Sequence, residues 1–357
     1  MATTGRSTAA TEPDAESVLA DAEFVRVTAA PTGGSVAAAA MLAGACDERG
    51  VPYQVRATRS APSAPDAAGT SLVAVGVESP AADVEFAEDA PNAAFDAARD
   101  LGADPDPVVA FAGALADGVE PSNDVREAAG LTRRPGVGIP TADLAAGLAH
   151  STLVHASFSG DEQAAGATLA ELGLPPELDE AAQRRLASAV ALDATDDATP
   201  RAADRVADVL RPHETPAGPF ETVEGYADVL AALAWAAPGL GVALAQGAVD
   251  APAALDAWRD HAGDAHAAVR RADPSRYSAV EVAEADAAQP TVARLVRDYR
   301  AREPAVLVVG DGTAALATTD ADARDVLPDS VGTATLAVAD FDADHSEALV
   351  DTVRGGL

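Results

Sequence analysis

The fold is decided by residues Phe24–Thr58, which read FVRVTAAPTGGSVAAAAMLAGACDERGVPYQVRAT. The stretch begins with an alternating, β-rich run at Phe24–Val27, and the turn Pro31–Gly34 ends that run. Val36–Arg49 is rich in the helix former Ala, and Gly50 follows at a position that favours a helix C-cap. The residues after Gly50 are expected to form a second strand. Strand, glycine turn, helix and strand in this order predict one unit of a parallel α/β sheet.

The turn between the first strand and the helix lies where an α/β enzyme holds its substrate, at the carboxyl end of a strand. Residues 28–35 contain no Asp, Glu, His or Lys. The turn therefore occupies a catalytic place but lacks side chains that bind metals or transfer protons.

This stretch resembles the opening of the DHH phosphoesterase superfamily, in particular its RecJ-like branch. Those proteins begin with a strand, the motif His-x-Asp-x-Asp-Gly, and an Ala-rich helix that ends Gly-(Ile/Val)-Pro-Tyr. Alignment without gaps from Gly50 places the family's metal-ligand positions at Ala30, Thr32 and Gly34. None of these residues can bind a hard divalent cation as histidine or a carboxylate does.

The other chemical motifs of the family are also degenerate. The Asp-His-His motif should follow a third strand, predicted at Leu72–Gly76, but the first histidine of the chain is His150. Glu78 stands near the family's Asp-x-Gly motif, and Asp117 ends a matching Gly-x-x-x-Asp run. We therefore expect no catalytic residue, no bound metal and no cofactor. The vestigial ligand positions are Ala30, Thr32, Gly34, Glu78 and Asp117.

The resemblance continues over most of the chain. Residues 148–174 are similar to archaeal RecJ-like nucleases that associate with the GINS complex, and residues 218–245 are similar to the start of their DHH-associated domain. Losses confined to the chemical motifs are expected of a nuclease-dead paralogue, such as the RecJ-like subunit of the eukaryotic replicative helicase. The resemblance implies an inactive interaction or scaffold subunit in DNA replication or repair, with the GINS complex as leading partner.

An active enzyme is the alternative. A RecJ-like exonuclease specific for single-stranded DNA could use an atypical set of ligands drawn from Glu78, Asp117 and Asp124, with manganese or magnesium as its metal. The residues favour a simpler role for Asp117, which is to cap or end a helix, because one carboxylate holds a divalent ion poorly.

Three arginines are candidate contacts to single-stranded nucleic acid or to a partner. Arg294, Arg297 and Arg300 recur at helical spacing, and the family's C-terminal domain binds single-stranded nucleic acid. Ion pairing with neighbouring acids on the surface is the competing explanation.

Several weaker motifs have plain structural explanations. His150 and His155, like His261 and His266, lie five residues apart, so neither pair shares a face, and no third zinc ligand is apparent. The second pair is expected on a solvated, charged helix face. Ser157 and Ser159 beside His155 could suggest a nucleophile and base, but a turn capped by Ser159 or Asp161 is simpler. Residues 308–313 lack the lysine and glycine spacing of a P-loop and predict a hairpin turn.

The chain carries a large acidic excess. It has 357 residues, 57 of them acidic and 24 basic, for a formal charge of −33, and every basic residue is arginine. A basic partner could explain this charge, but the lack of lysine and the low aromatic content favour a hydrated surface adapted to molar salt. Screening shrinks to about 3 Å at 1 M salt, so the net charge does not argue against DNA binding.

Composition also limits the location of the protein. Cys46 is the only cysteine, which excludes internal disulfides and thiolate metal clusters, and it is expected to be a small buried hydrophobe. No apolar run is long enough to span a bilayer, so we expect a cytoplasmic protein with no membrane partner.

The chain divides into four predicted parts. Residues 1–16 form a disordered tail, 17–192 a degenerate DHH-like domain, 193–219 a linker with a helix, and 220–357 a DHH-associated-like domain. The predicted class is α/β, with a parallel-sheet N-terminal domain and a smaller α/β C-terminal domain.

Overall fold

A four-stranded parallel sheet, in the order β2-β1-β3-β4, forms the base of the N-terminal unit. The structure is a computed structural model and describes residues 15–60, 62–65, 69–175, 178–216, 218–310, 312–342 and 345–357. Val27 of β1 pairs with Val55 and Val73 of the flanking strands. The predicted parallel α/β unit is confirmed. The strands are β1 (Phe24–Ala29), β2 (Tyr53–Ala57), β3 (Thr70–Val75) and β4 (Val84–Phe86).

Helix α2 is the central helix of this unit, because 13 of its 16 residues are buried. A helix that is apolar on all sides must be enclosed by other elements, and its many alanines let those elements approach closely. The tail predicted at residues 1–16 lies outside the described residues up to residue 14, and helix α1 begins at Ala15. The helices of this part are α1 (Ala15–Ala20), α2 (Gly33–Glu48), α3 (Ala90–Asp100), α4 (Pro107–Ala116) and α5 (Asn123–Ala129).

Three later helices complete the same core. Helices α10 (Val223–Ala236) and α11 (Pro238–Ala245) pack against α2, and the first half of α12 (Ala251–Arg271) supplies Trp258 to the core. The core therefore does not divide at the predicted boundary between residues 219 and 220. The turn-rich composition of residues 193–219 predicted a domain boundary there. The helix that follows, α10, instead packs its apolar face against α2 and α4 of the N-terminal unit.

Four helices form the middle of the chain: α6 (Leu144–His150), α7 (Glu162–Leu172), α8 (Glu180–Thr195) and α9 (Pro200–Val209). Asp161 caps α7 by accepting the backbone N–H groups of Gln163 and Ala164, as the sequence predicted. Residues 121–140, which precede α6, contain α5 and the buried residues Val137 and Ile139.

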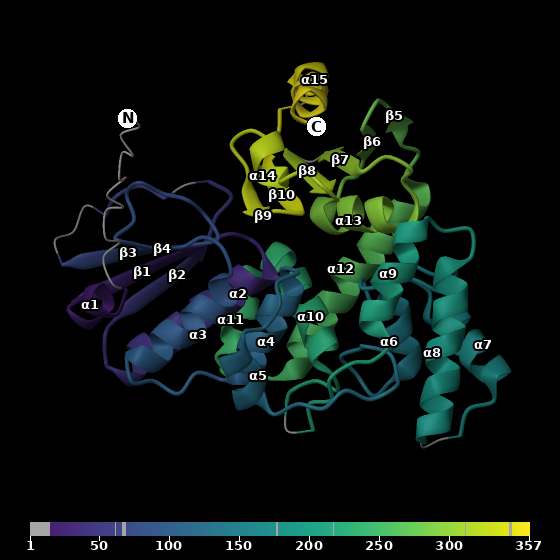
Figure 1. Ribbon diagram of the computed structural model, residues 1–357, viewed down its shortest axis with the longest axis horizontal. Helices are drawn as coiled ribbons and strands as arrows, with labels where there is room; N and C mark the ends of the chain where they lie inside the picture. The colour runs from purple at the N-terminus through teal and green to yellow at the C-terminus, as the bar shows by residue number, and fades with distance from the viewer. Residues whose placement is uncertain are drawn as a thin grey trace, which may run out of the picture.

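The C-terminal unit is a second, mixed sheet in the order β5-β6-β7-β8-β10-β9, in which only β6 and β7 pair in parallel. Strands β7 and β8 form the predicted hairpin, although Asp311 of its turn lies outside the described residues. Figure 1 shows this sheet with α13–α15 above the helices and the parallel sheet at the left. The elements are β5 (Ser275–Arg276), β6 (Val280–Glu284), α13 (Gln289–Tyr299), β7 (Ala305–Gly310), β8 (Thr313–Thr318), α14 (Ala323–Val326), β9 (Val331–Thr333), β10 (Leu336–Asp340) and α15 (Ser346–Gly356).

Candidate functional site

The turn after β1 leads directly into the N-terminus of α2, where the backbone N–H groups of a helix are free to bind an acceptor. Thr32 is the N-cap residue, and its hydroxyl oxygen accepts the backbone N–H of Ser35 at 3.2 Å. The first turn contains no acidic residue of its own. The acceptor comes instead from another helix.

Asp117, the residue that follows α4, supplies that acceptor. Its Oδ1 accepts the backbone N–H of Gly34 at 2.8 Å, and its Oδ2 accepts the hydroxyl of Thr32 at 2.8 Å. Burial raises the pKa of Asp117 to about 6, although these hydrogen bonds and one from the Ser35 N–H favour the charged form. The predicted capping role of Asp117 is confirmed, and it serves α2 as well as the end of α4.

The contacts around this carboxylate leave no room for the ligands of a metal site. A Cβ added to Gly34 would lie 2.4 Å from Asp117 Oδ2, so an aspartate at this position would collide with it. Ala30, at the family's histidine position, is fully buried in an apolar cluster that includes Ala74 and Val77. The residues present therefore do not fit a divalent cation.

The atypical ligand set also fails to assemble. Glu78 and Asp124 are both exposed. Burial and then the nearby Asp124 charge raise the pKa of Asp96 on α3. Within the described ranges, no three His, Cys, Asp or Glu side chains are placed to hold one ion.

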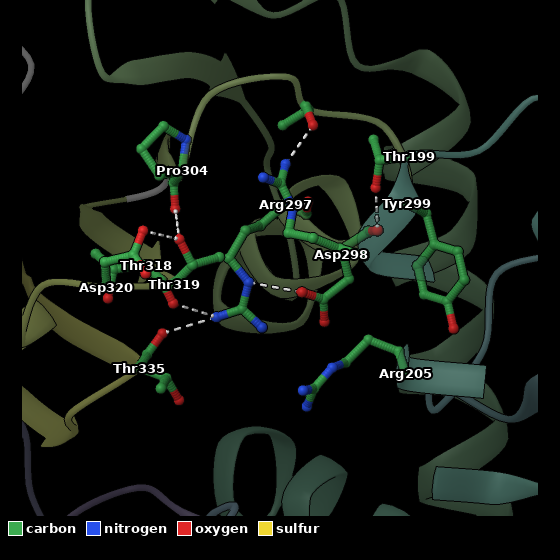
Figure 2. Close-up of polar contacts among 12 residues, drawn as sticks. Thr199, Arg205, Arg297, Asp298, Tyr299, Pro304, Thr318, Thr319, Asp320 and Thr335 are labelled. Carbon is green, nitrogen blue, oxygen red and sulfur yellow. Dashed lines mark hydrogen bonds and ion pairs between the residues drawn. The ribbon is translucent and has the colours of Figure 1, made fainter. Parts of the chain in front are cut away.

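Arg294 and Arg297 lie in α13 and Arg300 is its C-cap residue, but the three do not form one exposed face. Arg297 is only 6% exposed, so its prediction as a surface contact is wrong. Its Nε donates to Asp298 Oδ1 at 2.7 Å, and its Nη1 donates to the carbonyls of Thr318 and Thr335 at 2.8 and 3.1 Å (Figure 2). Helical spacing identified the helix but could not show what packs against it.

The other two arginines also bind backbone carbonyls. Arg294 donates to the carbonyl and the hydroxyl of Thr152, both at 3.0 Å. Arg300 donates to the carbonyls of Val269 and Ala272 at the end of α12. Both side chains therefore stabilise α13 against neighbouring elements.

The loop at residues 151–160 carries a buried polar network that the sequence did not predict. His266 is fully buried rather than solvated, which corrects the expected charged face, and His261 is 6% exposed. The Nδ1 atoms of His155 and His266 are 3.1 Å apart, and His266 Nε2 lies 3.0 Å from the Ser151 carbonyl. Burial is the main cause that lowers the pKa of His155 to about 4 and of His266 to about 3.

A buried carboxylate holds the start of the same loop. Asp228 of α10 accepts the Thr152 backbone N–H at 2.9 Å and the Trp258 indole N–H at 3.0 Å. Burial raises the pKa of Asp228, and the hydrogen bonds from Thr152 act in the opposite direction. Only the pairing of distant helices, which no local motif encodes, brings these groups together.

Comparison with known proteins gives one close relative in sequence. The chain is 46% identical over 327 residues to the uncharacterized protein rrnAC1427 of Haloarcula marismortui, across 88% of this chain and 86% of that protein. Residues 272–355 match the family model for the C-terminal domain of uncharacterized protein rrnAC1427. This range coincides with the mixed sheet and its helices.

Solved structures provide the likeness in fold. The crystal structure of CDC45 from Entamoeba histolytica has a TM-score of 0.57 at 6% identity, over 95% of this chain and 96% of that one. The crystal structure of exonuclease RecJ bound to manganese has a TM-score of 0.45 at 13% identity, over 96% and 92%. The likeness to CDC45 shows the fold, and the two-domain α/β class predicted from the sequence is confirmed.

Proposed function

This chain belongs to the family of the Haloarcula marismortui protein rrnAC1427 and has a RecJ-like DHH fold, and from this we propose that it is a catalytically inactive RecJ-like interaction subunit of DNA replication or repair. Its leading partner is the GINS complex, which the resemblance to archaeal RecJ-like proteins implies. The same resemblance and the acidic, lysine-free composition point to a cell with molar internal salt.

One observation carries the proposal. Of the two carboxylates at the vestigial ligand positions, Glu78 is exposed, and Asp117 accepts hydrogen bonds from the Gly34 N–H and the Thr32 hydroxyl. A metal ion would have to displace both donors, and the described residues place no group of three His, Cys, Asp or Glu side chains to hold it. Hydrolysis of a phosphodiester in this fold depends on metal ions that activate water and neutralise developing charge.

Contacts between the two units favour a rigid scaffold. Arg59, which follows β2, donates from Nη1 to Thr313 Oγ1 at 2.8 Å, and its Nη2 lies 3.2 Å from Asp340 Oδ1. Its guanidinium also lies 5.8 Å from the ring centroid of Trp235 on α10. A side chain that joins β8, β10 and α10 couples the mixed sheet to the parallel-sheet unit.

Two measurements test the proposal. Calorimetric titration of the purified protein with Mn²⁺ and with Mg²⁺ in about 2 M KCl should give no saturable binding, and labelled single-stranded DNA should remain intact with either metal. Co-expression with the GINS subunits of the same organism, followed by size-exclusion chromatography in high salt, should give a common peak.

Metal-dependent hydrolysis that Asp117→Asn abolishes would overturn the proposal, because it would establish the active exonuclease. A GINS complex that elutes separately at every salt concentration would reject GINS as the partner.

Among the described residues, no helix combines the length and apolar character needed to cross a bilayer.

A further inference from the structure

A pocket with a cavity volume of about 890 Å³ lies between α8, the end of α9 and the segment before Gly136. Basic residues outnumber acidic ones in its lining by four to two, whereas acids exceed bases by 57 to 24 in the whole chain. The pocket thus reverses the charge balance of the protein. Its charged lining residues are Arg133, Arg134, Arg184, Arg211, Glu180 and Glu214.

A buried carboxylate positions one of these arginines through a histidine. Glu224 of α10 is 6% exposed, and its Oε1 lies 2.8 Å from His213 Nδ1 while its Oε2 accepts the His213 backbone N–H at 2.8 Å. Arg133 Nε donates to His213 Nε2 at 3.1 Å. His213 Nε2 must accept, so its proton sits on Nδ1 and is directed at Glu224.

The same arrangement leaves the terminal nitrogens of Arg133 and Arg134 available, whereas Arg184 is already paired through Nη2 with Glu180. Arg134 is held by an ion pair of 3.0 Å between its Nε and Glu214 Oε2. Backbone hydrogen bonds hold the segment that carries Arg133 and Arg134, since the Arg134 N–H donates to the Pro212 carbonyl and the Glu214 N–H donates to the Thr132 carbonyl. Arg211 has no side-chain partner among the described residues. Guanidinium groups held by Nε can still offer paired N–H groups to a carboxylate or phosphate.

The pocket also has an apolar floor, formed by Leu178, Ala187 and Leu210. Leu192 continues the row of Arg184 and Ser188 along α8 and is 74% exposed. No aromatic side chain is among the described residues that line the pocket, so it offers no surface on which bases could stack. Arginines around an apolar floor suit a ligand that combines carboxylates with aliphatic side chains.

We infer that this arginine-lined pocket binds an acidic, amphipathic segment of a protein partner. Carboxylates of the segment pair with Arg133, Arg134 and Arg211, and an aliphatic side chain lies on the floor. Charge pairing alone is weak at high salt, and the apolar contact supplies attraction that salt does not screen. This inference rests on the proposed role as an interaction subunit and assigns a surface to it.

Fluorescence anisotropy tests the inference with three labelled probes: a short synthetic helical peptide of Glu and Leu, its counterpart with Gln in place of Glu, and oligo(dT). Wild-type protein should bind the Glu peptide at least about tenfold more tightly than the Gln peptide in about 0.5 M KCl. The double variant Arg133→Gln/Arg211→Gln should lose this preference. The matched control Arg126→Gln/Arg276→Gln removes two surface arginines outside the pocket and should bind as wild type does.

Equal affinity for the two peptides, or no saturable binding of either, would overturn the inference. Tighter binding of oligo(dT) that the pocket variant weakens would make the pocket a nucleic-acid site and overturn it as well. Elution with the GINS subunits and the absence of nuclease activity are measured separately. The pocket can therefore fail while the proposed function stands, and the reverse also holds.

Discussion

The backbone N–H of Gly34 donates a 2.8 Å hydrogen bond to the carboxylate of Asp117, which joins the first turn of α2 to the end of α4. In the RecJ-like alignment both residues stand at metal-ligand positions. In this structure Gly34 offers only its backbone N–H, and the Asp117 carboxylate is the acceptor that joins the two helices. These hydrogen bonds and the positive end of the α2 dipole favour the charged form of Asp117, but burial outweighs them and raises its pKa to about 6.

Gly34→Ala should destabilise the fold by about 2 kcal/mol, because its Cβ would lie 2.4 Å from Asp117 Oδ2 in a packed site. Gly44→Ala in the same helix is the matched control, since nothing lies within 4 Å of its added Cβ. Removing a helical glycine there should stabilise by about 0.5–1 kcal/mol. Urea unfolding of both variants in high salt measures the difference. Equal stabilities would contradict the close contact at Gly34.

Asp117→Asn should flatten the dependence of stability on pH between about 4 and 6. The pKa of Asp117 is raised from 3.8 to about 6, so the folded state binds a proton more tightly than the unfolded state. The contribution of Asp117 to the free energy of unfolding is largest below pH 3.8. It falls by up to about 3 kcal/mol as the pH rises through 6. The asparagine keeps an oxygen for the Gly34 N–H but does not titrate. Unfolding curves at several pH values compare it with wild type, and identical slopes would refute the shift.

Much of the fold could be predicted from local patterns. The β-rich run at Phe24–Val27 lies within β1, and the Ala-rich run at Val36–Arg49 lies in α2 up to Glu48. The residue types at Ala30 and Thr32 could be read directly from the sequence. What failed depends on distant packing. The apolar face of α10 looks the same whether it packs on its own domain or on α2, and the spacing of Arg297 gives its helix but not its burial. The contact of His155 with His266 spans 111 residues.

His155→Asn should reduce the loss of stability in mild acid. The pKa of His155 is lowered from 6.5 to about 4 by burial and then by Arg270 and Arg300, so unfolding takes up a proton in this range. Stability from this group is present above pH 6.5 and is lost toward pH 4, by about 2 kcal/mol at pH 5. Asparagine can place its amide N–H near His266 Nδ1 and cannot titrate.

The control for this change is His345→Asn, whose histidine side chain is 74% exposed. It should leave the acid limb of the stability curve as in wild type. Unfolding free energies at pH 7 and pH 5 give the comparison. An acid limb that is unchanged in His155→Asn would show that the buried pair does not govern it.

Arg297→Gln should cost about 3 kcal/mol, because it leaves the buried carboxylate of Asp298 without its cation and two carbonyls without a donor. Figure 2 shows that this guanidinium joins α13 to Thr318 of β8 and to Thr335, which lies between β9 and β10. Arg302→Gln, an exposed arginine just after the same helix, should change stability by less than about 0.5 kcal/mol.

A double variant separates the ion pair from the packing around it. Adding Asp298→Asn to Arg297→Gln removes the unpaired buried charge, so the two changes together should cost less than the sum of the single changes. Unfolding of the four proteins in urea gives the coupling energy. If the losses of unfolding free energy in the two single variants simply added in the double variant, the ion pair would make no contribution of its own. The hydrogen bonds to the two carbonyls would then account for the loss of stability in Arg297→Gln.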